Sequence, residues 1–191
     1  MEEKISIQKE KVLTAYKQAS EEQKTLLESM FGKDVFQPKN IMERVKTFED
    51  ACEVLGEEHS YVQEYRGVAN INFDFTQDII AYLKLRIICA ALNEGLKSKF
   101  AGNELRYYPW FDFYTKEEYD KLDNNKKTEC SIVGISHKKM SPNGCICCSC
   151  AFGTSSIAYK GICSRLALKT EELANYCGKQ FIDIWAYFLF A

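Results

Sequence analysis

The stretch Tyr107-Tyr108-Pro109-Trp110-Phe111-Asp112-Phe113-Tyr114 divides this chain of 191 residues into two parts of different character. Aromatic residues are enriched in β-strands, so the stretch predicts a strand or extended segment. Pro109 is expected to interrupt it, because proline has no N–H to donate. Apolar residues recur at helical spacing before the stretch, whereas short strand-like runs and turns follow it. The sequence therefore predicts an α+β fold, with a helical region over residues 1–100 and a smaller mixed region over 101–191 that closes with a helix.

Capping residues and glycines predict the boundaries of the helices in the first region. Ser20-Glu21-Glu22-Gln23 fits a capping box, and Gly32 is expected to end the helix that follows it. Asn40 is expected to begin one continuous helix that ends at Gly56, and the spacing over Thr76–Asn93 predicts another long helix. The helix that begins at Asn40 is predicted to carry its apolar residues on one face: Ile41, Val45, Phe48, Cys52 and Leu55.

The second region is predicted to consist mainly of short helices and strands. Thr115-Lys116-Glu117-Glu118 fits a capping box for a short helix. Ser131–Ile135 and Ser164–Lys169 are each predicted to form a short strand. Thr170 is expected to cap a single final helix, whose apolar stripe comprises Phe181, Ile184, Trp185, Phe188 and Leu189.

The net charge and the length of the apolar runs argue against some classes of binding partner. The net charge is −2 with the signs interspersed, which argues against a generic phosphate-binding surface and hence against nucleic acid as the partner. No apolar run reaches the roughly 18 residues of a membrane span, and the charged start gives no secretory signal. The nine cysteines are an odd number, so a complete internal disulfide framework is excluded. The thiols are expected to be free, metal-bound or both.

Four of these thiols cluster in Cys145-Ile146-Cys147-Cys148-Ser149-Cys150. A zinc site is the alternative hypothesis here, since zinc takes four sulfur or nitrogen ligands. The two Cys-x-x-Cys pairs overlap, however, and a strand would turn Cys148 and Cys150 to the face opposite Cys145 and Cys147. The favoured interpretation therefore has no cofactor. The candidate zinc ligands of the alternative are Cys145, Cys148, Cys150 and Cys163, in a module that binds nucleic acid or protein.

A recognition loop over residues 136–163 is the favoured interpretation of this segment. Its composition is rich in Ser, Gly, Cys and Lys with isolated aromatics, and long irregular segments in compact chains are usually functional. At least half of the aromatic residues near Pro109 are expected to pack in the core. The candidate ligand-binding residues are Tyr107, Tyr108, Trp110, Tyr114, His137, Lys138, Lys139, Phe152 and Tyr159.

Residues 106–111 and two further stretches resemble segments of known proteins. The two further stretches are Tyr114-Thr115-Lys116-Glu117-Glu118 and Ser164-Arg165-Leu166-Ala167-Leu168-Lys169-Thr170, which continues to Trp185. With them the chain resembles a family of small uncharacterised proteins from phages and prophages of Bacteroidetes. The resemblance implies a location in the cytoplasm of the bacterial host or in association with the virion.

The segment Val133–Arg165 is also similar to the variable region of target proteins of diversity-generating retroelements. That resemblance implies a C-type-lectin-like fold displaying a diversified ligand-binding surface, and adenine mutagenesis of asparagine codons would account for the clustered cysteines. The chain departs from the pattern at Lys138, Lys139, Met140 and Lys160.

Together these observations favour a non-enzymatic binding protein of a phage or mobile element that presents a variable surface loop. Its partner would be a protein, a glycan or a small host molecule, met by the virion or sequestered in the cell. No membrane partner is expected, and self-association into a homo-oligomer stays open. An enzyme with a cysteine nucleophile has no supporting constellation of residues.

Overall fold

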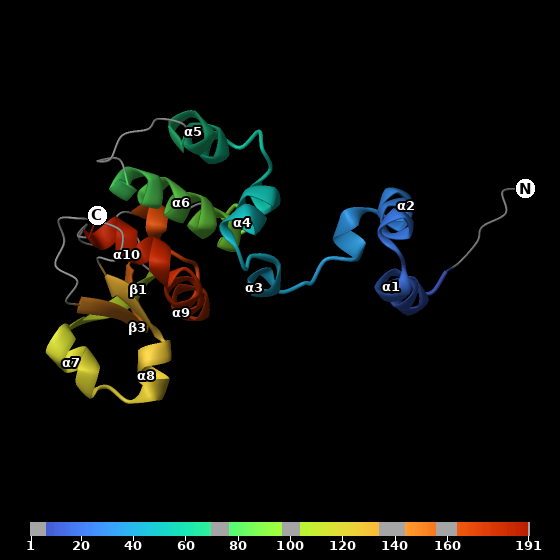
Figure 1. The fold of residues 1–191 in the computed structure, drawn as a ribbon. Helices are drawn as coiled ribbons and strands as arrows, with labels where there is room; N and C mark the ends of the chain where they lie inside the picture. The colour runs from blue at the N-terminus through green and yellow to red at the C-terminus, as the bar shows by residue number, and fades with distance from the viewer. Residues whose placement is uncertain (1–6, 70–76, 97–103, 134–143, 156–163, 191) are drawn as a thin grey trace, which may run out of the picture. The chain divides into compact units, whose positions relative to one another are not determined.

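The computed structural model describes residues 7–69, 77–96, 104–133, 144–155 and 164–190 (Figure 1). It has a mixed architecture of helices and a small antiparallel sheet, as the α+β prediction requires in outline. The chain divides into two compact units, Met1–Arg44 and Val45–Ala191.

The first unit is a small helical module. It contains α1 (Lys9–Gln18), α2 (Glu21–Phe31), a 3₁₀ turn η1 (Lys33–Val35) and α3 (Ile41–Arg44). The predicted capping box at Ser20 is present, and Gly32 ends α2 with a φ of 84°, a conformation that favours glycine. The Tyr16 ring stacks on Phe36 with ring centres 4.1 Å apart. Helix α2 buries no side chain, so the core of this unit is slight.

The continuous helix predicted between Asn40 and Gly56 is wrong, because Thr47 starts a new helix, α4 (Phe48–Leu55). The Thr47 side chain accepts a hydrogen bond from the Asp50 backbone, while the Asp50 carboxylate accepts from the backbone N–H of Lys46 and Thr47. These bonds replace the intrahelical ones that a continuous helix would make, which favours a break at this point. Gly56 ends α4 with a φ of 85°, as expected.

Helix α6 (Gln77–Leu92) is the centre of the second unit, and it matches the helix predicted over Thr76–Asn93. It packs against α4, α5 (Ser60–Ala69) and the C-terminal helix α10 (Ile182–Phe190). A helix that is apolar on most sides is a core helix, and α6 fits that description. Its buried residues are Ala81, Leu83, Leu85, Ile87, Ile88, Cys89, Ala91 and Leu92.

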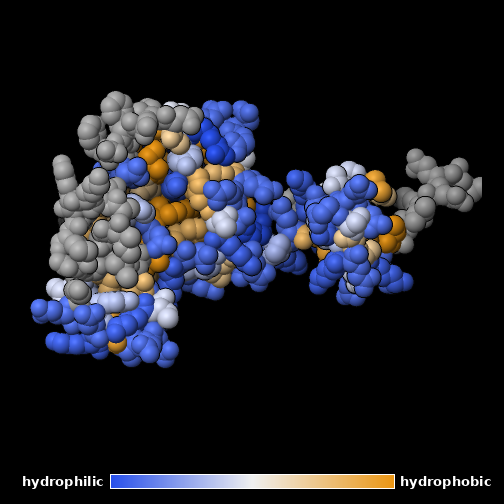
Figure 2. All heavy atoms as spheres, viewed as in Figure 1, coloured by the Kyte–Doolittle hydropathy of each residue, from blue (hydrophilic) through white to orange (hydrophobic). Residues whose placement is uncertain are grey.

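The described residues form one three-stranded antiparallel sheet with the order β1-β3-β2. Its strands are β1 (Leu105–Thr115), β2 (Cys130–Val133) and β3 (Gly144–Ser155). Between β1 and β2 lie α7 (Lys116–Lys121) and α8 (Asn124–Thr128), whose surfaces are hydrophilic (Figure 2). The predicted capping box at Thr115 begins α7.

The expected interruption at Pro109 is wrong. Tyr107 exchanges two backbone hydrogen bonds, of 3.0 and 2.8 Å, with Leu168 on the outer edge of β1. Bonding direction alternates along a strand, so Pro109, two residues on, turns its nitrogen to the same outer edge. A proline there removes no hydrogen bond to β3, and β1 continues through it.

The recognition loop predicted over 136–163 is wrong for residues 144–155, which form the central strand of the sheet. The remaining residues of that prediction, 136–143 and 156–163, lie outside the described residues. Free cysteines pack as small apolar residues, and Cys145 and Cys148 are buried in this strand, which the loop-like composition did not indicate. The strand predicted over Ser164–Lys169 is also wrong: a 3₁₀ turn, η3 (Ser164–Leu166), precedes a single bridge at Leu168.

The final helix is likewise two helices, α9 (Glu171–Gln180) and α10 (Ile182–Phe190), separated at Phe181. Thr170 caps α9 as predicted, with its side chain accepting a hydrogen bond from Leu173. Helix α9 packs on β1 and β3, and the Trp185 ring of α10 lies 5.3 Å from the Phe111 ring. One face of the sheet is therefore covered by helices.

Candidate ligand-binding face of the sheet

A bulge in β3 decides which side chains lie on which face of the sheet. Phe111 pairs with Cys148 and Trp110 pairs with Cys150, which leaves Ser149 as an extra residue in β3. Successive residues of β1 point to opposite faces, so Cys148 shares the face of Phe111 and Cys150 shares the face of Trp110. Without the bulge, Cys148 and Cys150 would lie on the same face.

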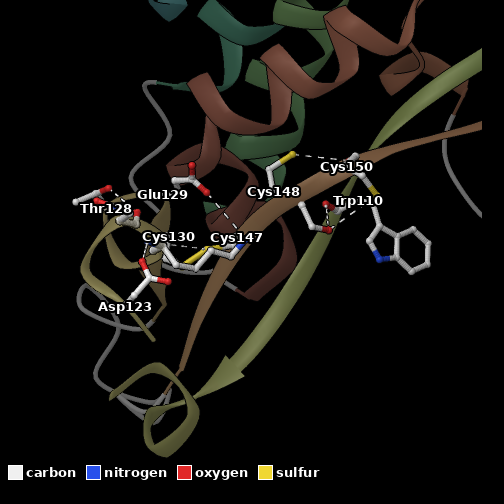
Figure 3. A network of polar contacts seen from close by, with 11 residues as sticks. Trp110, Asp123, Thr128, Glu129, Cys130, Cys147, Cys148 and Cys150 are labelled. Carbon is white, nitrogen blue, oxygen red and sulfur yellow. Dashed lines mark hydrogen bonds and ion pairs between the residues drawn. A yellow bond between two sulfur atoms is a disulfide. The ribbon is translucent and has the colours of Figure 1, made fainter. Parts of the chain in front are cut away.

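The face of Cys148 is closely covered by α9. A Cβ added at Gly178 would lie 2.6 Å from the Cβ of Pro109 and still closer to the Cys148 sulfur, so only glycine fits this helix–strand contact. Figure 3 shows the Cys148 side chain pointing toward the helices and Trp110 pointing away from them. Ile146 lies on the same covered side and is fully buried. We call this the helix-covered face.

The opposite face exposes a pair of aromatic rings. Trp110 is 52% exposed and Phe152 is 48% exposed, and their ring centres lie 6.0 Å apart. The Ser149 hydroxyl donates a 3.4 Å hydrogen bond to the Trp110 carbonyl, and Cys150 beside it is an exposed free thiol. Neighbouring exposed apolar side chains mark interaction surfaces more often than scattered ones do. We call Trp110, Ser149, Cys150 and Phe152 the aromatic face.

The expectation that every thiol is free or metal-bound is wrong for Cys130 and Cys147, which form a disulfide between β2 and β3 (Figure 3). Six cysteines of the described chain are free, and of these only Cys150 is exposed. Burial raises the pKa of the Cys145 thiol, and burial raises the pKa of Cys148 to about 11. Both thiols are therefore protonated at neutral pH, the state in which a cysteine is a poor nucleophile and a poor metal ligand.

The structure does not bring the candidate zinc ligands together. Cys145 lies on the same side of β3 as the disulfide, Cys148 lies on the helix-covered face, and Cys163 is outside the described residues. Within the described ranges, no group of three or more His, Cys, Asp or Glu side chains is placed to hold a metal ion.

Of the candidate ligand-binding residues, the structure brings together Trp110 and Phe152. Tyr108 is buried, as expected for part of the aromatic set, whereas Tyr107 and Tyr114 are half-buried. The Tyr107 ring lies over Gly153, where an added Cβ would be 2.9 Å from a ring carbon. Four candidates lie outside the described residues: His137, Lys138, Lys139 and Tyr159.

Sequence reasoning missed Ser149 as a member of the surface and assigned Cys150 to the opposite face. A bulge has no reliable signature in a single sequence, because it depends on pairing with a second strand. Helix α7 follows β1 directly after Thr115 and packs against β1 and β3. The aromatic face begins near the middle of the pairing, at Trp110 and Cys150, and extends away from the Thr115 end next to α7.

A cavity of about 280 Å³ lies between α6 and α10, lined in part by Lys84, Asp183 and Tyr187. Pockets that bind small molecules usually enclose about 300–1,000 Å³. The cavity falls just below that range, which makes the aromatic face the stronger candidate.

Comparison with protein-family models, with curated proteins and with solved structures finds no match for this chain. Among the described helices, none combines the length and the apolar character needed to cross a membrane.

Proposed function

We propose that this chain is a non-enzymatic binding protein of a phage or mobile element, and that the aromatic face contacts its ligand without a cofactor. The exposure of Trp110 and Phe152 as neighbouring rings is the observation that carries the proposal. Tryptophan is enriched at the energetic centres of interfaces, and rigid aromatic rings contribute contact area at a small cost in conformational entropy. Ser149 and Cys150 supply polar groups beside the rings.

The proposal keeps the C-type-lectin-like interpretation in a narrower form. Residues of the segment that resembles a variable region, Ser149, Cys150 and Phe152, are displayed on one side of an antiparallel sheet instead of on a loop. The ligand class is a protein, a glycan or a small host molecule. A tilted pair of rings suits the apolar face of a sugar as well as an apolar protein side chain.

The disulfide supports the virion-associated form of this function over sequestration inside the cell. Disulfides persist in oxidising surroundings and are rare in the reducing cytosol. The free thiols other than Cys150 are buried in the described chain, so they are protected from oxidation in such surroundings.

The test compares three immobilised proteins: wild type, the double variant Trp110→Ala/Phe152→Ser, and Phe113→Ala. Phe113 is the matched control, because it is 57% exposed on the same strand but points to the helix-covered side, where its ring meets Phe190. Each protein is incubated with host-cell surface fractions and with a glycan array. We expect a ligand that wild type and Phe113→Ala retain and the double variant loses. A ligand retained equally by all three proteins would contradict the proposal.

A further inference from the structure

Strand β1 lies at one border of the sheet, and part of its outer edge has no partner in the described chain. The strand order β1-β3-β2 leaves β1 with one neighbouring strand. On its outer edge, Tyr107 bonds to Leu168 through a single bridge. Beyond Pro109, no such bridge is found among the described residues. We call Phe111–Thr115 the open edge of β1.

Phe111 and Phe113 direct their backbone N–H and C=O groups to the open edge. Bonding direction alternates along an antiparallel strand, and Tyr107 bonds outward. The bulge adds its extra residue, Ser149, to β3, so the alternation continues along β1. On this edge, the backbone groups of Phe111 and Phe113 form no hydrogen bond with any described residue.

The disulfide gives independent support for this direction. The Cα atoms of Cys130 and Cys147 are 4.4 Å apart, the spacing of a pair that exchanges no backbone hydrogen bonds. The backbone groups of Cys147 therefore point to β1, where its partner is Asp112. Asp112 thus bonds inward, and the backbone groups of its neighbours Phe111 and Phe113 point outward.

The open edge also lacks the devices by which proteins protect an edge strand. Such strands usually carry lysine or proline, or are covered by another element. Phe111–Thr115 contains neither residue, and Phe113 is 57% exposed. Within the sheet, α10 packs mainly against β2 and β3. An exposed apolar edge with unpaired backbone groups is a site at which another strand can add.

A second copy of this chain could pair with the open edge in antiparallel registers centred on different residues, and two of these meet a conflict. A register centred on Asp112 places the two Asp112 carboxylates directly opposite each other, where like charges repel. A register centred on Phe111 places Thr115 of the second copy opposite Tyr107. The outward groups of Tyr107 are already bonded to Leu168, so that position is occupied.

The register centred on Phe113 avoids both conflicts. Each Phe113 exchanges its backbone hydrogen bonds with its counterpart, and the Phe111 N–H meets the Thr115 carbonyl of the second copy. The Thr115 N–H is already bonded within its own capping box, so only its carbonyl is needed. Asp112 then opposes the neutral Tyr114 of the second copy, and the two Phe113 rings form a cross-strand aromatic pair.

We propose that the open edge of β1 is a dimerisation surface, on which a second copy of this chain adds its own β1 in the antiparallel register centred on Phe113. The two sheets then form one continuous sheet. The residues of the aromatic face take no part in the pairing, so the dimer does not depend on the proposed function. The rival occupant is an extended segment of a different protein, which would leave this chain monomeric on its own.

The test measures the dimer dissociation constant of the full chain by analytical ultracentrifugation for wild type and Phe113→Pro. Proline at this position removes an outward N–H and no hydrogen bond to β3, and β1 already tolerates Pro109 at an outward position. The matched control is Phe113→Val, which loses the same ring but keeps the N–H. Circular dichroism and Tm establish that each variant is folded.

Two further measurements test the same register. Hydrogen exchange of wild type needs no variant: protection of the Phe111 and Phe113 amides should rise with protein concentration. Asp112→Asn should dimerise within about twofold of wild type, because no second carboxylate faces Asp112 in the register centred on Phe113.

We expect Phe113→Pro to dimerise about thirtyfold more weakly than wild type, the factor for two lost backbone hydrogen bonds, and Phe113→Val to lose less than about fivefold. The proposal is overturned if wild type is monomeric at every concentration measured, or if Phe113→Pro dimerises as tightly as Phe113→Val. Amide protection that does not change with concentration overturns it too. Tighter dimerisation of Asp112→Asn would show that the strands pair about Asp112 and would overturn the proposed register.

Discussion

Strand β3 has two halves that share a residue type but not an environment. Cys145, Cys147 and Cys148, in the first half, are at most 2% exposed, whereas Cys150, beyond the Ser149 bulge, is exposed next to Trp110. The first half holds the core of the sheet together through packing and a disulfide. The second half contributes to the aromatic face. Cysteines that are adjacent in sequence therefore have different roles here, because the bulge at Ser149 determines on which face of the sheet each side chain lies.

The largest expected effect concerns the buried half. Ile146→Ala removes a fully buried side chain between the sheet and its covering helices. It should therefore lower the free energy of unfolding by about 2–5 kcal/mol. Urea unfolding followed by circular dichroism measures this change. Phe152→Ala, in the exposed half, is the control and should shift stability by no more than about 0.5 kcal/mol. If both variants lost the same free energy of unfolding, the distinction between a buried and an exposed half of β3 would be contradicted.

A second prediction concerns the disulfide that fixes the buried half to β2. The cysteines are separated by 17 positions. Cross-linking a loop of this length stabilises a folded chain by about 3 kcal/mol. Reduction should therefore lower the free energy of unfolding by about that amount, as measured by urea unfolding with and without a phosphine reductant.

The control for this prediction is the double variant Cys130→Ala/Cys147→Ala, which should be as unstable as the reduced wild type and insensitive to reductant. A reductant that destabilises the double variant equally would show that the effect comes from elsewhere in the chain.

The third and smallest expected effect separates Cys148 from Cys150 by titration. Burial raises the pKa of Cys148 to about 11 in the folded chain. The unfolded chain loses this proton at lower pH, so the folded state binds more protons between the two pKa values and stability falls as pH rises. From about pH 9 to pH 11 the loss should reach about 2–3 kcal/mol.

Because lysines and tyrosines also titrate in this range, the informative quantity is the difference between wild type and Cys148→Ala, measured by urea unfolding at several pH values. Cys150→Ala is the matched control and should retain the pH dependence of the wild type. Identical pH dependence in all three proteins would refute the assignment of Cys148 to the core.

Local signals in the sequence located much of the fold correctly. The capping boxes at Ser20 and Thr115 and the cap at Thr170 begin helices where expected, because such bonds need only neighbouring residues. Helix α6 also matches its prediction, since its repeat of apolar residues is long.

Features that depend on distant partners were not predictable in this way. Continuity of β1 through Pro109 depends on which edge its nitrogen faces, and that edge is established by pairing with Leu168. The bulge at Ser149 and the pairing of Cys130 with Cys147 likewise depend on strand register. The aromatic face was half predicted, since Trp110 and Phe152 were both candidates but nothing local indicated that they would be neighbours.

The link between Cys130 and Cys147 also bears on how this protein can evolve. It joins β2 to β3 just outside the connection between Val133 and Gly144, so the spacing of the two strands does not depend on the residues of that connection. Loop-closure entropy grows only slowly with length, by about 0.6 kcal/mol for each doubling. Substitutions and insertions between Val133 and Gly144 should therefore accumulate with little loss of stability while the pairing of β2 with β3 persists.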